Sequence, residues 1–100
     1  MRVIALKPLR EFWDQHPDSE TPLRIWFKLA TNAKWESLLQ LRADLPKTDG
    51  IKNRRGEILT VFNIAGNKYR LIARIRYDYQ LINVRDILTH AEYDKEKWKA

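Results

Sequence analysis

The chain has 100 residues, of which 44% are hydrophobic and 11% aromatic, and this composition fits a folded domain and argues against intrinsic disorder. The absence of cysteine excludes disulfides and thiolate metal sites, and no apolar run approaches the roughly 20 residues that cross a bilayer. The apolar stretch at the N-terminus is too short for a signal peptide. We therefore expect a cytoplasmic protein without membrane association, in which residues 1–100 form a single domain with a net charge of +6.

The first third of the chain predicts a short strand over residues 2–5 and two amphipathic helices within residues 8–33. Pro8 suits the first turn of a helix, and His16-Pro17 ends it. Thr21 and Pro22 fit the N-cap and the first position of the second helix. Apolar side chains repeat at helical spacing in both helices, at Leu9, Phe12, Trp13 and His16, and then at Leu23, Trp26, Phe27 and Ala30. We interpret both stripes as core and His16 as structural.

Residues 34–56 are predicted to form an irregular connector. The segment holds a short apolar patch at residues 38–41, and turn-forming residues at 44–46 and 49–50 follow it. Trp35 is expected to attach the connector to the core.

The second half of the chain predicts three antiparallel strands, over residues 57–63, 68–77 and 81–88. Gly66-Asn67 supplies a hairpin turn between the first two, and residues 78–80 supply the next turn. Thr89 and Glu92 match a capping box that starts a short C-terminal helix, with Leu88 and Tyr93 as a hydrophobic staple. The expected fold is α+β, with an N-terminal strand and two helices packed on an antiparallel sheet.

The positive charge is concentrated in the second half. Residues 1–50 carry 8 basic and 7 acidic residues, whereas residues 51–100 carry 11 basic and 6 acidic. Most of the excess comes from Lys52, Arg54, Arg55, Lys68, Arg70, Arg74 and Arg76. Such a segment on a folded domain indicates a polyanionic partner, the alternative being a charge that only keeps a small protein soluble.

The strand over residues 68–77 is expected to turn basic side chains to one face. With a period of two, the core face consists of Tyr69, Leu71, Ala73, Ile75 and Tyr77. The opposite face consists of Lys68, Arg70, Ile72, Arg74 and Arg76. Arg85 of the next strand could join this face or lie behind it. The row is either a solvated surface or a phosphate-binding surface, and the dominance of arginine favours phosphate.

The predicted helix start places His90 and Tyr93 close to this face. A helix N-terminus disfavours the imidazolium, so a neutral His90 could act as a general base. Tyr93 could bind a phosphate. The alternatives are a surface position for His90 and a packing role for Tyr93. The sequence contains no carboxylate pair, Ser/His/Asp set, metal-ligand spacing or glycine-rich phosphate loop, so we expect neither a metal nor a cofactor.

Two blocks of sequence, Val-Phe-Asn-Ile-Ala-Gly-Asn-Lys-Tyr-Arg-Leu-Ile at 61–72 and Thr-His-Ala-Glu-Tyr-Asp-Lys at 89–95, resemble the HigB family of type II toxin–antitoxin toxins. The resemblance is specific over residues 57–98 and looser in the N-terminal half. It implies a RelE-like fold and a ribosome-dependent mRNA endonuclease that inhibits translation and growth. Cleavage would use the 2′-hydroxyl of the RNA, without a metal. The resemblance also implies a HigA-type helix-turn-helix antitoxin, which would be the chain's only link to operator DNA.

Under this resemblance, Arg70 would stabilise charge on the phosphate, His90 would act as base or acid, and Tyr93 would orient groups or transfer a proton. The residues expected to bind the backbone of mRNA in the ribosomal A site, or of ribosomal RNA, are Lys68, Arg74, Arg76, Arg54, Arg55 and Lys97. Two other hypotheses remain open at this point. One is a noncatalytic nucleic-acid-binding module, and the other is a degenerate toxin that only binds its antitoxin.

Overall fold

A computed structural model describes residues 1–4 and 6–100 of the chain. Ala5, which the sequence assigns to the first strand, lies outside the described residues. The helices and strands are β1 (Arg2–Ile4), α1 (Leu6–Gln15), α2 (Glu20–Asn32), α3 (Leu38–Asp44), β2 (Asp49–Lys52), β3 (Ile58–Ile64), β4 (Tyr69–Arg76), β5 (Leu81–Thr89) and α4 (His90–Asp94). Two short 3₁₀ turns, η1 (Pro17–Ser19) and η2 (Lys97–Lys99), complete the described elements.

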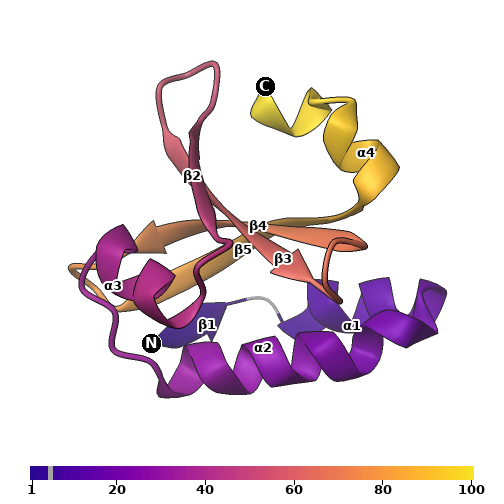
Figure 1. The fold of residues 1–100 in the computed structure, drawn as a ribbon, viewed down its shortest axis with the longest axis horizontal. Helices are drawn as coiled ribbons and strands as arrows, with labels where there is room; N and C mark the ends of the chain where they lie inside the picture. Colours follow the sequence, from indigo (N-terminus) through magenta and orange to yellow (C-terminus); the bar gives the residue numbers. More distant parts are fainter. Residues whose placement is uncertain (5) are drawn as a thin grey trace.

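The strands of this part of the chain form one five-stranded sheet in the order β1-β5-β4-β3-β2. β1 runs parallel to β5, and every other pair is antiparallel. Helices α1 and α2 lie along one side of the sheet, whereas α4 and the C-terminus lie on the other (Figure 1). The α+β, RelE-like architecture expected from the sequence is therefore confirmed.

The main core lies between the sheet and the two N-terminal helices. Leu9 of α1, Leu23 of α2 and Leu71 of β4 have no exposed surface. Trp26 packs edge-on against Phe62 of β3, with ring centres 5.2 Å apart. The predicted apolar stripes of both helices and the core face of β4 are confirmed by this cluster.

A smaller apolar cluster covers the opposite face of the sheet. Leu59, Val61 and Ile72 form its floor, and Trp98 of η2 lies on top with 6% of its surface exposed. Burial of the Trp98 ring attaches the C-terminal segment to the sheet, since an aromatic side chain removes a large apolar area from water. The sheet thus carries apolar side chains on both faces.

The prediction of an irregular connector over residues 34–56 is wrong. The segment contains α3 and β2, and β2 pairs with β3 from Asp49↔Val61 to Lys52↔Ile58. Ser37 caps α3 by accepting a hydrogen bond from the Gln40 amide. Trp35 is 3% exposed and belongs to the main core cluster, which confirms that it attaches the connector to the core, and its Nε1 donates a hydrogen bond of 2.8 Å to Asp44 within the same segment.

Two helix starts also differ from the prediction. α1 begins at Leu6, two residues before Pro8, and α2 begins at Glu20 after the 3₁₀ turn η1. Thr21 and Pro22 therefore lie inside the first turn of α2 rather than at its cap. A proline is tolerated there because the first amides of a helix have no partner within the helix. The predicted end of the first helix before Pro17 is confirmed.

Candidate functional site

The outer face of β4 is not the continuous row of cations that strand alternation predicts. Ile72 has no exposed surface beneath Trp98, and it separates Arg70 at one end from Arg74 and Arg76 at the other. Lys68 lies in the turn before the strand, where it forms an ion pair with Asp18 of η1 on the helical side. The prediction of a continuous basic face is therefore wrong. The basic side chains lie at the two ends of β4, and an apolar surface separates them.

Arg70 is buried and held in one orientation, with 7% of its surface exposed. Its Nη1 donates to the carbonyl oxygens of Asn67 and Tyr69, at 3.0 and 3.2 Å, and its Nη2 donates to Asn67 Oδ1 at 2.7 Å. Asn67 sits in the hairpin turn, where positive φ angles of 54° at Ala65 and 67° at Gly66 reverse the chain. The turn chemistry that the sequence reveals thus also positions a guanidinium.

Tyr93 of α4 lies beside this guanidinium. The Arg70 Cζ atom is 5.3 Å from the centre of the Tyr93 ring, a distance at which a cation is attracted to an aromatic face. Tyr93 stacks in turn on Trp98, with ring centres 4.9 Å apart and planes 14° apart. Burial raises the pKa of the Tyr93 phenol above its ordinary value, and the positive charge of Arg70 opposes this only in part. The phenol is therefore a hydrogen-bond donor at neutral pH.

The start of α4 carries the predicted capping box. Thr89 Oγ1 accepts a hydrogen bond from the Glu92 amide at 3.2 Å, and Glu92 accepts one from the Thr89 amide at 2.9 Å. This backbone hydrogen bond lowers the pKa of Glu92. The predicted staple residues, Leu88 and Tyr93, both pack against the cluster under Trp98. The cap fixes where the first turn of α4 begins.

His90 occupies the first position of α4, as predicted. Its amide donates to the carbonyl of Lys68 at 3.2 Å, which joins the helix start to the strand that carries Arg70. Its Nε2 atom lies 3.4 Å from the carboxylate of Asp94, one turn along the helix, and its side chain is 53% exposed. The imidazole is therefore accessible to a ligand and has a carboxylate that can orient it.

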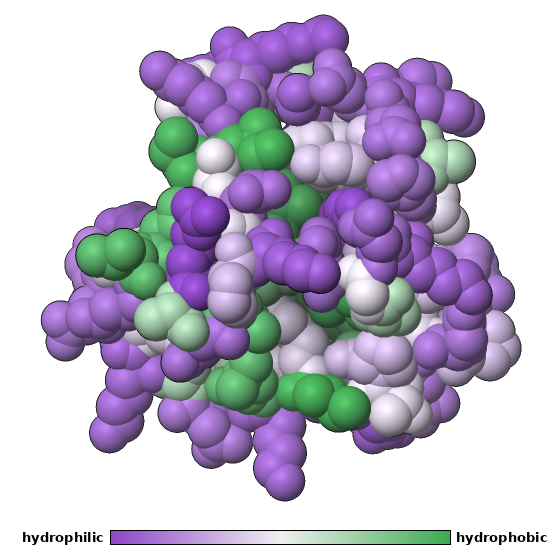
Figure 2. Space-filling model, in the orientation of Figure 1, coloured by the Kyte–Doolittle hydropathy of each residue, from purple (hydrophilic) through white to green (hydrophobic). Residues whose placement is uncertain are grey.

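The remaining basic candidates divide into two groups. The amide of Arg54, in the β2–β3 loop, donates to the carbonyl of Lys99 at 2.9 Å, so the loop that carries Arg54 and Arg55 meets the C-terminal turn that carries Lys97. Figure 2 shows hydrophilic side chains over this end of the molecule. Arg74 faces Glu57 across the sheet, with Nε 3.2 Å from the carboxylate.

Arg76 lies at the far end of β4. It pairs with Asp78 at 2.9 Å and sits over the Tyr79 ring. Lys68 is likewise paired with a carboxylate, that of Asp18 on the helical side of the sheet.

Arg85 is a basic residue that the sequence could not place. The β4–β5 register shifts between Ile72 and Ala73, so that Asp86 and Val84 are paired but Arg85 is left over as a bulge. Arg85 and Asp86 then line one hollow of about 470 Å³, together with Leu88, Glu92, Lys95, Lys97 and Trp98. Its Nη1 atom is buried without a hydrogen-bond partner among the described residues. Strict alternation cannot predict a bulge.

Within residues 1–4 and 6–100, no three His, Asp or Glu side chains gather as a set of metal ligands. In the same part of the chain, every helix is too short or too polar to cross a membrane.

Comparison with known proteins identifies the family. The sequence profile of the HigB toxin, described as the RelE-like toxic component of a toxin–antitoxin system, matches residues 19–96. The chain belongs to the HigB toxin family. The HigB resemblance carried by the blocks at 61–72 and 89–95 is therefore confirmed, and the match also extends into the N-terminal half. Membership in this family implies an antitoxin as partner.

Curated HigB proteins are similar over nearly the whole chain. The mRNA interferase toxin HigB of Escherichia coli K12 is 28% identical over 94 residues, which cover 94% of this chain and 88% of that protein. The mRNA interferase HigB of Shigella flexneri matches to the same extent. The mRNA interferase HigB of Escherichia coli O6:H1 is 27% identical over 95 residues, covering 95% and 90% of the two chains.

Proposed function

We propose that this protein is an endoribonuclease that cleaves translated mRNA in the cytoplasm and acts as the toxin of a toxin–antitoxin pair. Membership in the HigB family and similarity to proteins named mRNA interferases support this activity. The observation that carries the site is the contact between Arg70 and Tyr93, next to the accessible His90 at the start of α4. A positioned guanidinium can stabilise charge on a phosphate, and an imidazole and a protonated phenol can transfer protons, so these three groups can supply phosphodiester cleavage without a metal.

The proposed reaction is attack of the 2′-hydroxyl of RNA on the adjacent phosphorus. His90 removes the proton from the 2′-oxygen, which forms a bond to phosphorus, and the bond to the 5′-oxygen breaks. The products are a 2′,3′-cyclic phosphate and a 5′-hydroxyl, which takes its proton from the Tyr93 phenol, and the proton held by His90 returns to Tyr93 through solvent. Arg70 stabilises the added negative charge through its remaining donors, Nε and one Nη2 hydrogen, which have no partner among the described residues. Tyr93 donates a hydrogen bond to the phosphate or to the leaving oxygen.

RNA backbone binding is assigned to the other basic candidates. Arg54, Arg55 and Lys97 lie where the β2–β3 loop meets the C-terminal turn. Arg74, Lys68 and Arg76 are expected to contribute less because each is already paired with a carboxylate. The proposed partners are mRNA in the ribosomal A site, ribosomal RNA and a HigA-type helix-turn-helix antitoxin, through which the toxin would reach operator DNA.

The test compares the full chain with its His90→Gln and Arg42→Gln variants on an mRNA, both free and on translating ribosomes. Arg42 is an exposed cation of α3 outside the site, so Arg42→Gln controls for folding. We expect cleavage of ribosome-bound mRNA that leaves 5′-hydroxyl and 2′,3′-cyclic phosphate ends, and a loss of about 10²- to 10⁴-fold in rate for His90→Gln only. If folded His90→Gln cleaves at the wild-type rate, the role of His90 is wrong.

A noncatalytic RNA-binding module is the second candidate, and the basic loop around Arg54 favours it. Binding of RNA without any cleavage on translating ribosomes would establish that alternative. A wild-type chain that neither binds nor cuts RNA but captures its antitoxin would instead be a degenerate toxin.

A further inference from the structure

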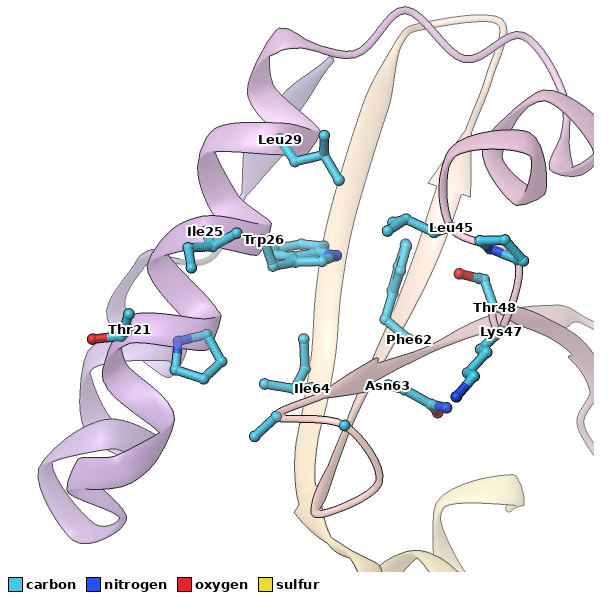
Figure 3. Close-up of a pocket in the computed structure, with 14 residues that line it drawn as sticks. Thr21, Ile25, Trp26, Leu29, Leu45, Lys47, Thr48, Phe62, Asn63 and Ile64 are labelled. Carbon is cyan, nitrogen blue, oxygen red and sulfur yellow. The ribbon is translucent and has the colours of Figure 1, made fainter.

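An apolar groove of about 530 Å³ lies on the helical side of the sheet, away from Arg70 and Tyr93. Its walls are α2, the loop between α3 and β2, and the end of β3 with the turn that follows. Figure 3 shows Trp26 and Leu29 of α2 on one side and Leu45 and Phe62 on the other. RNA does not suit such walls, because its phosphates stay hydrated and bind cations rather than aliphatic side chains.

Two apolar side chains of α2 stay exposed at this groove. Ile25 is 64% exposed and Leu29 is 39% exposed, and their spacing of four residues places them on the same face of the helix. Figure 2 shows hydrophobic side chains gathered over α2. Neighbouring exposed apolar side chains beside a groove are typical of a surface that binds another protein.

Trp26 provides a second and independent observation. The residue is 5% exposed, and its indole Nε1 has no hydrogen-bond acceptor among the described residues. In Figure 3 this nitrogen points from α2 into the groove, towards Leu45 and Phe62. Buried N–H groups in folded proteins are nearly always bonded. A bound segment that moves the loop carrying Leu45 and offers a carbonyl or carboxylate oxygen would satisfy this donor.

The charge of the groove indicates which charge a bound protein segment should carry. Lys47 is the single charged residue among those that line the groove, and none of the carboxylates that the structure describes forms an ion pair with it. The chain as a whole carries +6. The groove therefore suits a protein segment that combines apolar side chains with an acidic one.

We propose that this groove is the docking site of the antitoxin, which inserts an amphipathic, acidic segment between α2 and the α3–β2 loop. The segment buries Ile25 and Leu29, accepts a hydrogen bond from Trp26 and pairs with Lys47. The inference rests on the proposed function, since it takes this chain to be the toxin of a pair. It implies that the antitoxin holds the toxin by a face other than the one proposed to cut RNA.

The test uses the full chain and the antitoxin encoded beside it, and measures binding separately from toxicity. Ile25→Asp and Leu29→Asp place a carboxylate on an exposed helix position, where folding tolerates it. We expect the antitoxin affinity to fall about 10- to 100-fold, because buried apolar contacts are lost. Both variants should arrest growth as the wild type does, and coexpressed antitoxin should no longer rescue it. Leu39→Asp is the matched control, since Leu39 is 81% exposed on α3 outside the groove.

Trp26→Phe removes the N–H and keeps an aromatic ring against Phe62, and its melting temperature separates the lost hydrogen bond from looser packing of the core. We expect a loss of about 3- to 10-fold in antitoxin affinity. Wild-type affinity in Ile25→Asp and Leu29→Asp would overturn the proposal. A change in self-association of the toxin alone, seen by sedimentation, would overturn it in favour of a second copy as occupant. If the wild type fails to arrest growth while these variants still lose antitoxin, the proposed activity fails and the docking site stands.

Discussion

The phenol of Tyr69 donates a hydrogen bond of 2.6 Å to the carboxylate of Asp18, which joins the hairpin at the start of β4 to the turn between α1 and α2. Lys68 pairs with the same carboxylate. The hydrogen bond from Lys68, followed by the one from Tyr69, lowers the pKa of Asp18 below its ordinary value. The two elements are therefore tied through an ionised carboxylate that lies outside both apolar clusters.

Acid should weaken the contacts of Asp18 with Lys68 and Tyr69. Because the pKa of Asp18 is lower in the folded protein than in the unfolded chain, its stabilisation is complete at pH values above about 4 and is lost as the pH falls through the folded pKa. We expect Asp18→Asn to lower the melting temperature at pH 7 and to flatten its dependence on pH below about 4. Asp14→Asn, the same change at an exposed position of α1, is the control. Equal acid sensitivity in the wild type and Asp18→Asn would refute the prediction.

Replacing Arg70 should affect both folding and cleavage. In Arg70→Lys the charge remains, but a single ammonium group cannot reproduce the three hydrogen bonds to Asn67 and Tyr69. We expect the free energy of unfolding to fall by about 1–3 kcal/mol, because buried acceptors lose their donors. The cleavage rate of the folded fraction should fall about 10²- to 10³-fold. Denaturant unfolding and single-turnover cleavage measure the two effects, and an unchanged rate in folded protein would remove Arg70 from the reaction.

The contributions of the Tyr93 hydroxyl and of the Tyr93 ring can be measured separately. Tyr93→Phe keeps the ring between Arg70 and Trp98, so we expect little change in stability and a loss of about 10-fold or more in cleavage rate. Since burial raises the pKa of this phenol above its ordinary value, it stays protonated well above neutral pH. The wild-type rate should therefore show no loss from Tyr93 ionisation between pH 7 and about 9. A decline in that range that is absent from Tyr93→Phe would contradict this assignment.

Trp98 should control the order of the C-terminal segment. Trp98→Ala removes the ring that covers Ile72 and stacks on Tyr93, and we expect a cost of about 3–5 kcal/mol. Trp98→Phe should retain most of the stability that Trp98→Ala loses. Hydrogen exchange should show early loss of protection in α4, whereas α2, which packs on the other face, keeps its protection. Uniform loss across both helices would mean that Trp98 supports the whole fold rather than one segment.

Periodicity explains which parts of the fold were predictable. The long helices and the hairpin strands repeat apolar residues at 3.6 or 2 residues, and the Thr89–Glu92 cap has its own signature. α3 and β2 have seven and four residues, too few for a period, and tertiary contacts stabilise them. A Cβ atom on Gly50 would lie 2.9 Å from a terminal methyl group of Leu38, so β2 packs closely against the side chain at the start of α3. No pattern in the sequence reveals that contact.

The sequence predicted which helix or strand carries each residue of the candidate site, but not which side chains these residues contact. The sequence placed Arg70 on a strand and His90 and Tyr93 on the helix that follows the next strand, and these positions are confirmed. The accessibility of each basic side chain depends on contacts between residues far apart in the sequence, which no local pattern reveals. Lys68 forms an ion pair with Asp18, 50 residues earlier in the chain. The bulge at Arg85 interrupts the alternation from which the orientation of that residue would have been predicted.

The parallel pairing of β1 with β5 also dictates when the fold can be completed. Residues 2–4 pair with residues 81–83, at the opposite end of the order in which the strands are synthesised. This edge of the sheet therefore stays open until β5 has been made, and α4, which follows β5, docks later still. A chain cut short before residue 81 would lack the partner of β1 and also the helix that carries His90 and Tyr93, so the sheet edge and the candidate site are completed together.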